Sequence, residues 1–339
     1  MECALCPHRC LIDEGKDGMC RARGVRDGAL VSLNYGRVCA RMVDQIEKKP
    51  IYHFRPGSKL LSLGTFGCNL DCDCCQNAAV ARSGLDEVKV PEETPEDMVG
   101  LALEKGAQGM AFTFNEPVVW SEFVLDTAHL ARDAGLYTMM NTNGFIEPGP
   151  LHELASMVDV FKVDVKGFTE AFYSRHCGGS LAPVLRTCEH LYRNGNHLEL
   201  AYLIIPGLND SKDELDRFFS WAVAGLGPQV PVHLYRFMPA HRLSHLKPTD
   251  LFAMREARSL AMERGLEFVY VSGMVGNDHT TVCPSCRSVA ITREAKEEAE
   301  RIVYEGRGLS KFCPSYSDVT DLTNEGRCRA CGHIICRVR

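Results

Sequence analysis

Short apolar runs alternate with helix-length segments from residue 59 to residue 273, and this alternation limits the folds open to the chain. Parallel strands need a crossover between them, so repeated strand–helix units build a parallel sheet. Such a sheet can close toward a barrel or stay open and doubly wound, and the alternation alone does not separate the two. The apolar runs cover residues 60–66, 109–114, 137–141, 158–163, 198–205, 232–237 and 268–271, and the helix-length segments include 118–134, 169–195, 212–224 and 250–264.

Polar residues follow six successive apolar runs. In a βα barrel, reactive side chains lie just past the carboxyl ends of the strands, where they share one mouth. Each polar residue has an ordinary alternative, such as a helix start beside Pro117 or a turn at Pro206-Gly207. Six in succession favour a partial (β/α)6, TIM-like barrel in an α/β protein, with one site at its mouth. In chain order they are Cys68, Asn115 and Glu116, Asn143, Asp164 and Lys166, Asn209 and Asp210, and Arg236.

The first of these runs leads into a loop that holds Cys68, Cys72 and Cys75 at C-x3-C-x2-C spacing. Three thiolates can hold three irons of a [4Fe–4S] cluster and leave the fourth iron open to a small molecule. Electron-carrying clusters and structural zinc sites instead close all four positions. A zinc half-site is the alternative, but it needs a fourth ligand nearby, and the spacing to His53 is not typical of one. We expect an iron–sulfur cluster at this loop.

A second group of cysteines opens the chain. Four thiols at short spacing can close a tetrahedral Zn²⁺ site or hold an auxiliary iron–sulfur cluster. Reduced surface thiols are the alternative, although such a density of exposed thiols is an oxidation liability. The sequence predicts metal binding here and leaves the metal open. The four residues are Cys3, Cys6, Cys10 and Cys20.

A third group near the end of the chain consists of two C-x-x-C pairs, Cys283 with Cys286 and Cys328 with Cys331. Two such pairs are typical of a zinc ribbon, so we expect a structural Zn²⁺. Cys313 and Cys336 are nearby thiols that could compete as ligands. The segment between the pairs is long and predicts a helix over residues 293–304.

Composition narrows the class of protein. Seventeen cysteines in 339 residues, many at C-x-x-C spacing, favour metal ligation over disulfides. The net charge of −6 argues against nucleic acid as a partner. No apolar run approaches the roughly 18–20 residues that span a bilayer, and Met1-Glu2-Cys3-Ala4 has no basic-then-apolar leader, so we expect a cytoplasmic protein with no membrane partner.

Cysteine content divides the chain into three expected parts. Residues 1–57 form a Cys-rich N-terminal segment, residues 58–275 the barrel, and residues 276–339 a Cys-rich, zinc-ribbon-like extension.

These motifs together resemble a known family, the radical S-adenosylmethionine (SAM) enzyme of the AmmeMemoRadiSam system, which is related to pyruvate formate-lyase-activating enzymes. The resemblance covers essentially the full chain. It rests on Cys6-Pro7-His8-Arg9-Cys10, Glu47-Lys48-Lys49-Pro50, the Cys68 loop ending in Cys75-Gln76-Asn77, Asn115-Glu116-Pro117, Asp164-Val165-Lys166, the segment from Ile204 to Asp210, and Cys283-Pro284-Ser285-Cys286.

The resemblance implies a SAM-binding [4Fe–4S] cluster on Cys68, Cys72 and Cys75 in an incomplete barrel. Glu116 would accept a hydrogen bond from the SAM amino group. Asn143, Asp164 and Lys166 match positions expected to contact SAM, and Ile205 would lie against the adenine. No catalytic side chain is assigned. One departure stands out, because the family places an aromatic residue directly before the third cysteine and this chain has Cys74, a rival ligand to Cys75.

The implied activity is reductive cleavage of SAM to a 5′-deoxyadenosyl radical, which abstracts hydrogen from an unidentified substrate. That substrate is a small molecule or a partner protein, handled with AMMECR1-like and Memo-like companions. A glycyl-radical activase of the pyruvate formate-lyase-activating type is the alternative, and a non-enzymatic zinc-binding interaction protein is a second one. We expect a flavodoxin- or ferredoxin-type electron donor.

Overall fold

A mostly parallel sheet of eight strands forms the centre of the molecule. The computed structural model describes residues 1–272, 279–303 and 310–336, with the backbone alone for 294–303 and 310–319. The strand order is β10-β9-β8-β7-β6-β5-β4-β3, in which β4 to β10 are parallel and β3 is antiparallel to β4. The strands are β3 (Ala40–Gln45), β4 (Lys59–Gly64), β5 (Gly109–Phe112), β6 (Tyr137–Thr142), β7 (Val160–Val165), β8 (His197–Ile204), β9 (Val232–Arg236) and β10 (Val269–Ser272).

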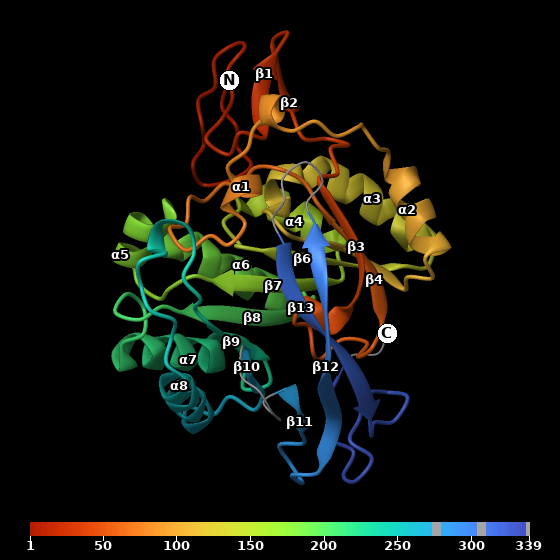
Figure 1. The fold of residues 1–339 in the computed structure, drawn as a ribbon, viewed down its shortest axis with the longest axis vertical. Helices are drawn as coiled ribbons and strands as arrows, with labels where there is room; N and C mark the ends of the chain where they lie inside the picture. The colour runs from red at the N-terminus through yellow and green to blue at the C-terminus, as the bar shows by residue number, and fades with distance from the viewer. Residues whose placement is uncertain (273–278, 304–309, 337–339) are drawn as a thin grey trace.

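Helices cross between the parallel strands and lie outside the sheet (Figure 1). Their starts have a local cause: Thr94 and Asp97 form a reciprocal capping box at α2, and the Ser211 side chain accepts the Glu214 N–H at α7. The α-helices are α1 (Ala78–Ala81), α2 (Pro95–Glu104), α3 (Ser121–Asp133), α4 (Pro148–Met157), α5 (Glu170–Phe172), α6 (Leu181–Arg193), α7 (Lys212–Leu226) and α8 (Leu251–Glu263). Shorter turns are η1 (Ile46–Lys48), η2 (Leu85–Glu87), η3 (Pro117–Trp120), the π-helix η4 (Tyr173–Cys177) and η5 (His241–Leu243).

The predicted fold class is confirmed: each of the seven apolar runs overlaps one parallel strand of an α/β sheet, with strand ends that differ from the run by up to two residues. The sheet has edge strands β3 and β10, so it is a partial barrel rather than a closed one. The segment 169–195 differs from a single helix, because η4 follows α5 and Gly178 with φ of 67° ends it before α6 begins.

The N-terminal segment contains the antiparallel hairpin of β1 (Arg23–Arg26) and β2 (Ala29–Ser32). This hairpin and β11 lie at opposite ends of the long axis of the molecule (Figure 1). Strand β3, which falls within residues 1–57, pairs with β4 along its whole length and so belongs to the central sheet. The proposed part boundaries at 57 and 275 stay predictions.

The C-terminal extension is a three-stranded antiparallel sheet of β11 (Thr281–Val282), β12 (Val289–Val303) and β13 (Ser310–Thr320). The helix predicted from residue 293 is therefore wrong over 293–303, and residue 304 lies outside the described residues. Helix-forming residues dominate that stretch, but β12 pairs with β13 from Ile291 to Val303 and cross-strand pairing overrides local propensity. The hairpin crosses the face of the sheet in Figure 1, where β13 contacts β3 and η1.

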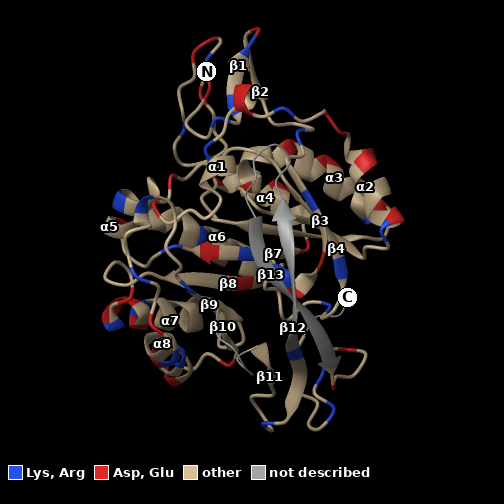
Figure 2. Ribbon diagram, in the orientation of Figure 1, with Lys and Arg blue, Asp and Glu red and all other residues tan. Residues whose placement is uncertain are grey.

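Lys and Arg are interspersed with Asp and Glu over the helices and loops (Figure 2), in keeping with the mild net charge of −6. In the described ranges, no helix combines the length and the apolar character needed to cross a membrane.

Candidate functional site

A cavity of about 590 Å³ opens at the carboxyl ends of the parallel strands. Its volume lies in the range of small-molecule sites, and its walls come from the ends of β4 to β9, which is where a βα barrel places its reactive groups. Among the residues predicted from the sequence, Asn209 and Asp210 do not line it, and those that do are Cys68, Cys72, Cys75, Asn115, Glu116, Asn143, Asp164, Lys166 and Arg236. The structure thus brings nine predicted residues from the ends of five strands, β4, β5, β6, β7 and β9, to one cavity.

The cysteine loop is fastened from outside by the π-helix η4. The N–H of Asp71 donates to the Cys177 carbonyl at 2.8 Å, and the N–H of Asp73 donates to the His176 carbonyl at 2.9 Å. Arg242 adds ion pairs to Asp71 at 3.0 Å and Asp73 at 3.1 Å. These contacts fix the loop backbone, so its thiols keep their direction into the cavity.

Glu116 is a buried carboxylate with one acceptor position to spare. Its Oε1 accepts the Thr142 hydroxyl at 2.6 Å and the Val118 N–H at 3.0 Å, and its Oε2 accepts the Asn143 N–H at 2.7 Å. A carboxylate oxygen has two lone pairs, so Oε2 can take one more donor. Burial raises the pKa of Glu116 to about 7, against the pull of those three hydrogen bonds.

Asn143 joins this carboxylate to the cysteine loop. Its side-chain amide donates to Asn69 Oδ1 at 2.8 Å and to the Cys68 sulfur at 3.8 Å, while its Oδ1 accepts the Phe145 N–H at 2.8 Å. Hydrogen bonds of this kind orient a thiolate and tune any cluster that it ligates.

Asp164 and Lys166 form an ion pair of 2.9 Å on the same wall. Burial opposes the charge on Lys166, but Asp164 and the nearby Cys72 outweigh it and hold its pKa well above the usual range. Ile205 is fully buried and is not one of the residues that line the cavity. Its N–H donates to the buried Asn209 at 2.6 Å, whose amide also donates to the Lys166 carbonyl at 2.8 Å. Asn209 therefore ties two strand ends together behind the cavity.

Three lysines that the sequence did not assign to the site also line the cavity, although two of them belong to the Glu-Lys-Lys-Pro motif. Lys162 Nζ, within β7, lies 2.8 Å from the Tyr235 hydroxyl of β9. Lys48 and Lys49 of the Glu-Lys-Lys-Pro motif pair with Asp44 at 3.5 and 2.5 Å. Lys162 could have been recognised because it interrupts an otherwise apolar run. A charged side chain is rarely buried in a strand without a partner, so its presence indicates a polar site.

Cys74 is buried beside the three loop thiols and lines the same cavity, with Cys75 half-buried next to it. Their rivalry as third ligand stays a prediction. Cys177 is a neighbour that the sequence did not indicate, and it approaches Cys72 closely enough to raise the pKa of that thiol, together with burial.

The donor set of the loop fits an open iron–sulfur cluster. Cys68, Cys72 and Cys75 have the C-x3-C-x2-C spacing and line one cavity, as a cubane with one free iron requires, and Cys74 is a fourth cysteine in the same lining. Their sulfurs do not all lie within 4.8 Å of one another, whereas ligands of a single ion do. Carboxylate, amide and ammonium groups stand beside them for a polar co-ligand.

The four C-terminal thiols lie close enough together to bind a single metal ion. Within the described part of the chain, only Cys283, Cys286, Cys328 and Cys331 form a group whose ligand atoms all lie within 4.8 Å. Cys283 is 3.6 Å from Cys331, and Cys286 is 3.6 Å from Cys328, close to the separation of thiolates about a tetrahedral Zn²⁺. Ser288 lowers the pKa of Cys286 to about 6, which favours the ligating thiolate. Cys336 lies apart, with its thiol toward the Tyr52 carbonyl, and the Cys313 side chain lies outside the described residues.

Several known proteins are similar to this chain in sequence or in fold. The family model described as the radical SAM superfamily matches residues 62–219. An uncharacterized protein of Methanocaldococcus jannaschii is 38% identical over 294 residues, which is 86% of this chain and 87% of that protein. The pyruvate formate-lyase 1-activating enzyme of Escherichia coli K12 is 24% identical over 159 residues, 44% of this chain and 63% of that enzyme. A radical SAM methyltransferase structure from Sphaerobacter thermophilus aligns with a TM-score of 0.50 and 16% identity over 66% of this chain and 68% of its own, a likeness of fold.

Proposed function

The chain belongs to the radical SAM superfamily and is related to pyruvate formate-lyase-activating enzymes, and we propose that it is an enzyme that reductively cleaves SAM and uses the resulting radical on a substrate in the barrel cavity. The observation that carries this proposal is the convergence of Cys68, Cys72 and Cys75 on the cavity wall that also presents Glu116 and the Asp164–Lys166 pair. The three-thiolate loop would leave one iron open to SAM, and the polar strand ends add groups that could hold the rest of that molecule.

Cys68, Cys72 and Cys75 would hold the cluster. When bound, a [4Fe–4S] cluster and SAM supply one-electron cleavage of the sulfonium and a 5′-deoxyadenosyl radical that abstracts hydrogen. The protein's own share is binding and orientation. Glu116 would accept a hydrogen bond from the SAM amino group on its remaining Oε2 lone pair, and Asn143 holds both that carboxylate and the Cys68 thiol in place.

The test is anaerobic reconstitution followed by reduction with dithionite in the presence of SAM. We expect 5′-deoxyadenosine from the wild type and none from Cys68→Ala. Matched Cys188→Ala, at a buried cysteine in α6 far from the three clusters in sequence, should keep the activity. Undiminished 5′-deoxyadenosine from Cys68→Ala would overturn the proposal.

For the substrate, we propose a small molecule or a partner protein of a system with AMMECR1-like and Memo-like companions. Six basic side chains line the cavity against four acidic ones, and this excess of positive charge supports a polar substrate with anionic groups; the basic residues are Lys48, Lys49, Arg82, Lys162, Lys166 and Arg236, and the acidic ones are Glu47, Asp71, Glu116 and Asp164. With a deuterated candidate, transfer of deuterium into 5′-deoxyadenosine would identify the substrate. An equal rate of unlabelled product with and without the candidate would exclude it.

A glycyl-radical activase is the second candidate, favoured by the match to the pyruvate formate-lyase 1-activating enzyme. It predicts a glycyl-radical doublet in the electron paramagnetic resonance (EPR) spectrum of a glycyl-radical enzyme incubated with this protein and SAM. Full SAM turnover without such a doublet would exclude that partner.

The proposed electron donor is a flavodoxin or ferredoxin, and the proposed compartment is the reducing cytoplasm, because reduced clusters and free thiols persist there. Reduced flavodoxin should replace dithionite in the same assay. A requirement for dithionite with every protein donor tried would count against it.

A further inference from the structure

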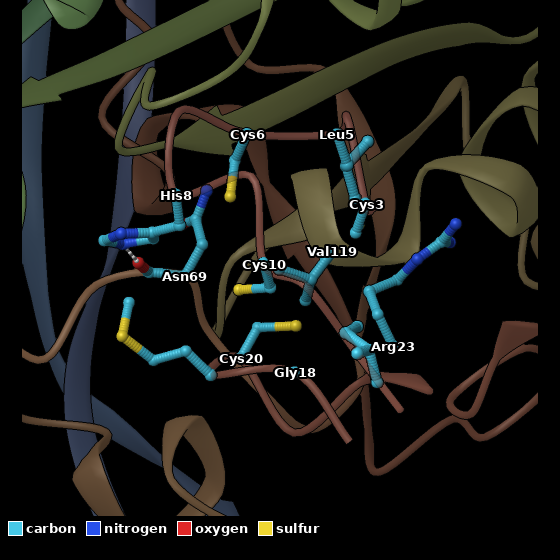
Figure 3. A pocket seen from close by; sticks show the side chains of 12 residues that line it. Cys3, Leu5, Cys6, His8, Cys10, Gly18, Cys20, Arg23, Asn69 and Val119 are labelled. Atoms are coloured by element: carbon cyan, nitrogen blue, oxygen red, sulfur yellow. Dashed lines mark hydrogen bonds between the residues drawn. The ribbon is translucent and has the colours of Figure 1, made fainter. Parts of the chain in front are cut away.

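The four cysteines that open the chain lie around a small cavity of their own. Cys3, Cys6 and Cys20 are buried and Cys10 is half-buried, and Figure 3 shows the side chains of Cys6, Cys10 and Cys20 gathered around this space. The backbone brings them together: the Cys3 N–H donates to the Cys10 carbonyl at 2.9 Å, and the turn after Cys6 closes through the Arg9 N–H at 3.0 Å. The alternative of exposed, unrelated thiols does not describe this arrangement.

The spacing of these sulfurs separates an iron–sulfur cluster from a single zinc ion. Thiolates around one Zn²⁺, with Zn–S bonds of about 2.3 Å, must lie close together. No three of the four sulfurs lie within 4.8 Å of one another, a statement that covers residues 1–20 completely because all of them are described. The C-terminal cysteines meet that limit, and the Cys68 loop, like the N-terminal group, does not. The thiolates of a cubane bind separate irons and so stand further apart than those of one ion.

A buried cation beside the cavity supports an anionic occupant. Arg23 is only 7% exposed and lines the cavity. Its guanidinium pairs with Glu122, but its Nε is buried without any acceptor among the described residues. Leu5, Ile12 and Val119 complete an apolar wall around the thiols. A metal that these four cysteines ligate as thiolates would form an anionic centre inside this wall, and such a centre suits a neighbouring arginine.

The cavity lies directly behind the Cys68 loop. Asn69 lines it, follows Cys68 in the chain, and accepts a hydrogen bond from Asn143, which also donates to the Cys68 sulfur. His8, between Cys6 and Cys10, is 2.8 Å from the Asn69 carbonyl (Figure 3). A Cβ on Gly67 would come within 2.7 Å of the Cys20 carbonyl, so glycine at φ of 89° permits the two loops to touch.

We propose that Cys3, Cys6, Cys10 and Cys20 hold a second [4Fe–4S] cluster, closed by four thiolates and packed against the back of the loop of Cys68, Cys72 and Cys75. With no open iron, this cluster cannot bind SAM, and its chemistry is limited to gaining one electron from a low-potential donor and passing it on. His8, which lies between two of its ligands, contacts the Asn69 carbonyl, and Asn69 directly follows Cys68, so a short path of covalent bonds and one hydrogen bond would join the two clusters.

The decisive variant replaces Cys68, Cys72 and Cys75 together by alanine in the full chain, followed by anaerobic reconstitution with iron and sulfide. We expect about four irons and four sulfides per chain to remain, with a dithionite-reduced EPR signal that SAM does not change. Loss of all iron would overturn the proposal. Zinc found in place of that iron, in addition to any zinc at the C-terminal cysteines, would overturn it in the same way.

The double variant Cys6→Ser with Cys10→Ser removes ligands of the other cluster, and it keeps the proposal testable if the triple alanine variant does not fold. It should lose about four irons relative to the wild type and retain the SAM-sensitive EPR signal, and Cys188→Ser should lose none. An unchanged iron count in Cys6→Ser with Cys10→Ser would also overturn the proposal. These counts do not depend on SAM cleavage, so the second cluster and the proposed function can fail separately.

Discussion

Replacing Glu116 by glutamine tests how the cavity would hold SAM. The carboxylate has one lone pair left on Oε2, which under the proposed function would accept a hydrogen bond from the SAM amino group. A hydrogen bond between charged partners contributes about 1.5–3 kcal/mol, and 1.4 kcal/mol is a tenfold change in affinity. Glu116→Gln removes the charge and keeps the size, so we expect SAM to bind about 10- to 150-fold more weakly at pH 8.

The same reasoning fixes the pH dependence. Because burial raises the pKa of Glu116 to about 7, the wild-type carboxyl is mostly ionised at pH 8 and mostly protonated at pH 6. SAM affinity of the wild type should therefore fall by about tenfold per pH unit below 7, and that of Glu116→Gln should not change. Isothermal titration on anaerobically reconstituted protein, with iron counted in each sample, measures both.

The stability of the protein without SAM should change in the opposite direction. The folded pKa of Glu116 lies above the unfolded value of 4.5, so the fold binds this proton more tightly than the unfolded chain does. That stabilisation is complete below pH 4.5 and is lost as the pH rises through about 7, with a magnitude of about 3 kcal/mol.

Glu214→Gln is the matched control for SAM affinity, since Glu214 is buried but lies outside the cavity lining. A less than threefold effect of Glu116→Gln on SAM affinity, or an equal pH dependence in that variant, would refute the reasoning.

Other predictions concern residues around the site and the extension. Cys283→Ser should release one zinc per chain and lower the melting temperature while the iron content is unchanged; retention of that zinc by mass spectrometry would contradict the metal assignment. Asn209→Ala removes three hydrogen bonds of 2.6–2.8 Å to backbone groups, so urea unfolding should show a loss of about 3 kcal/mol, and a loss below 1 kcal/mol would argue against the clamp. Glu199→Ala leaves two buried histidines and the N–H groups of Tyr52 and His53 without their acceptor, and we expect at least about 3 kcal/mol of destabilisation by the same assay, with unchanged unfolding as the contrary result.

The apolar runs predicted the sheet well because each buried strand carries its own signal. A strand of the barrel interior is apolar on both faces, as in β5, and the polar residues that follow it mark where it ends. For that reason the sequence could indicate Cys68, Glu116, Asn143 and Asp164 as neighbours before any of their contacts were known. Ile205, carried over from the resemblance, has no such signal of its own, and it lies behind the cavity wall.

Features that depend on pairing across the chain could not be predicted in this way. Residues 293–303 consist mainly of helix formers, and only their partner strand β13 makes them a strand. Strand β3 looked like part of the N-terminal segment because its register with β4 leaves no local pattern. The contact of His8 with the Asn69 carbonyl joins residues 61 positions apart, and nothing in either segment indicates the other.

Two buried carboxylates show how a reaction site differs from a structural clamp made of the same residue types. Glu199, at the amino end of β8, accepts from His197 at 2.9 Å, from His233 at 2.6 Å and from two backbone N–H groups. Burial pushes its pKa up, but these donors outweigh burial and hold the pKa well below the usual range. Glu116, at the carboxyl end of β5, has fewer donors and no histidine, and burial raises its pKa to about 7.

The difference follows from what each end of the sheet must do. At the amino ends, Glu199 and its histidines hold the segment of Tyr52 and His53 to the sheet, and a satisfied network is the stable solution. At the carboxyl ends, a carboxylate left one donor short can gain free energy from a ligand that brings a positive charge. Incomplete hydrogen bonding, more than burial or residue type, therefore marks Glu116 as part of a binding site, and the same criterion applied to the unpaired Arg23 Nε points to the second cavity at Cys3, Cys6, Cys10 and Cys20.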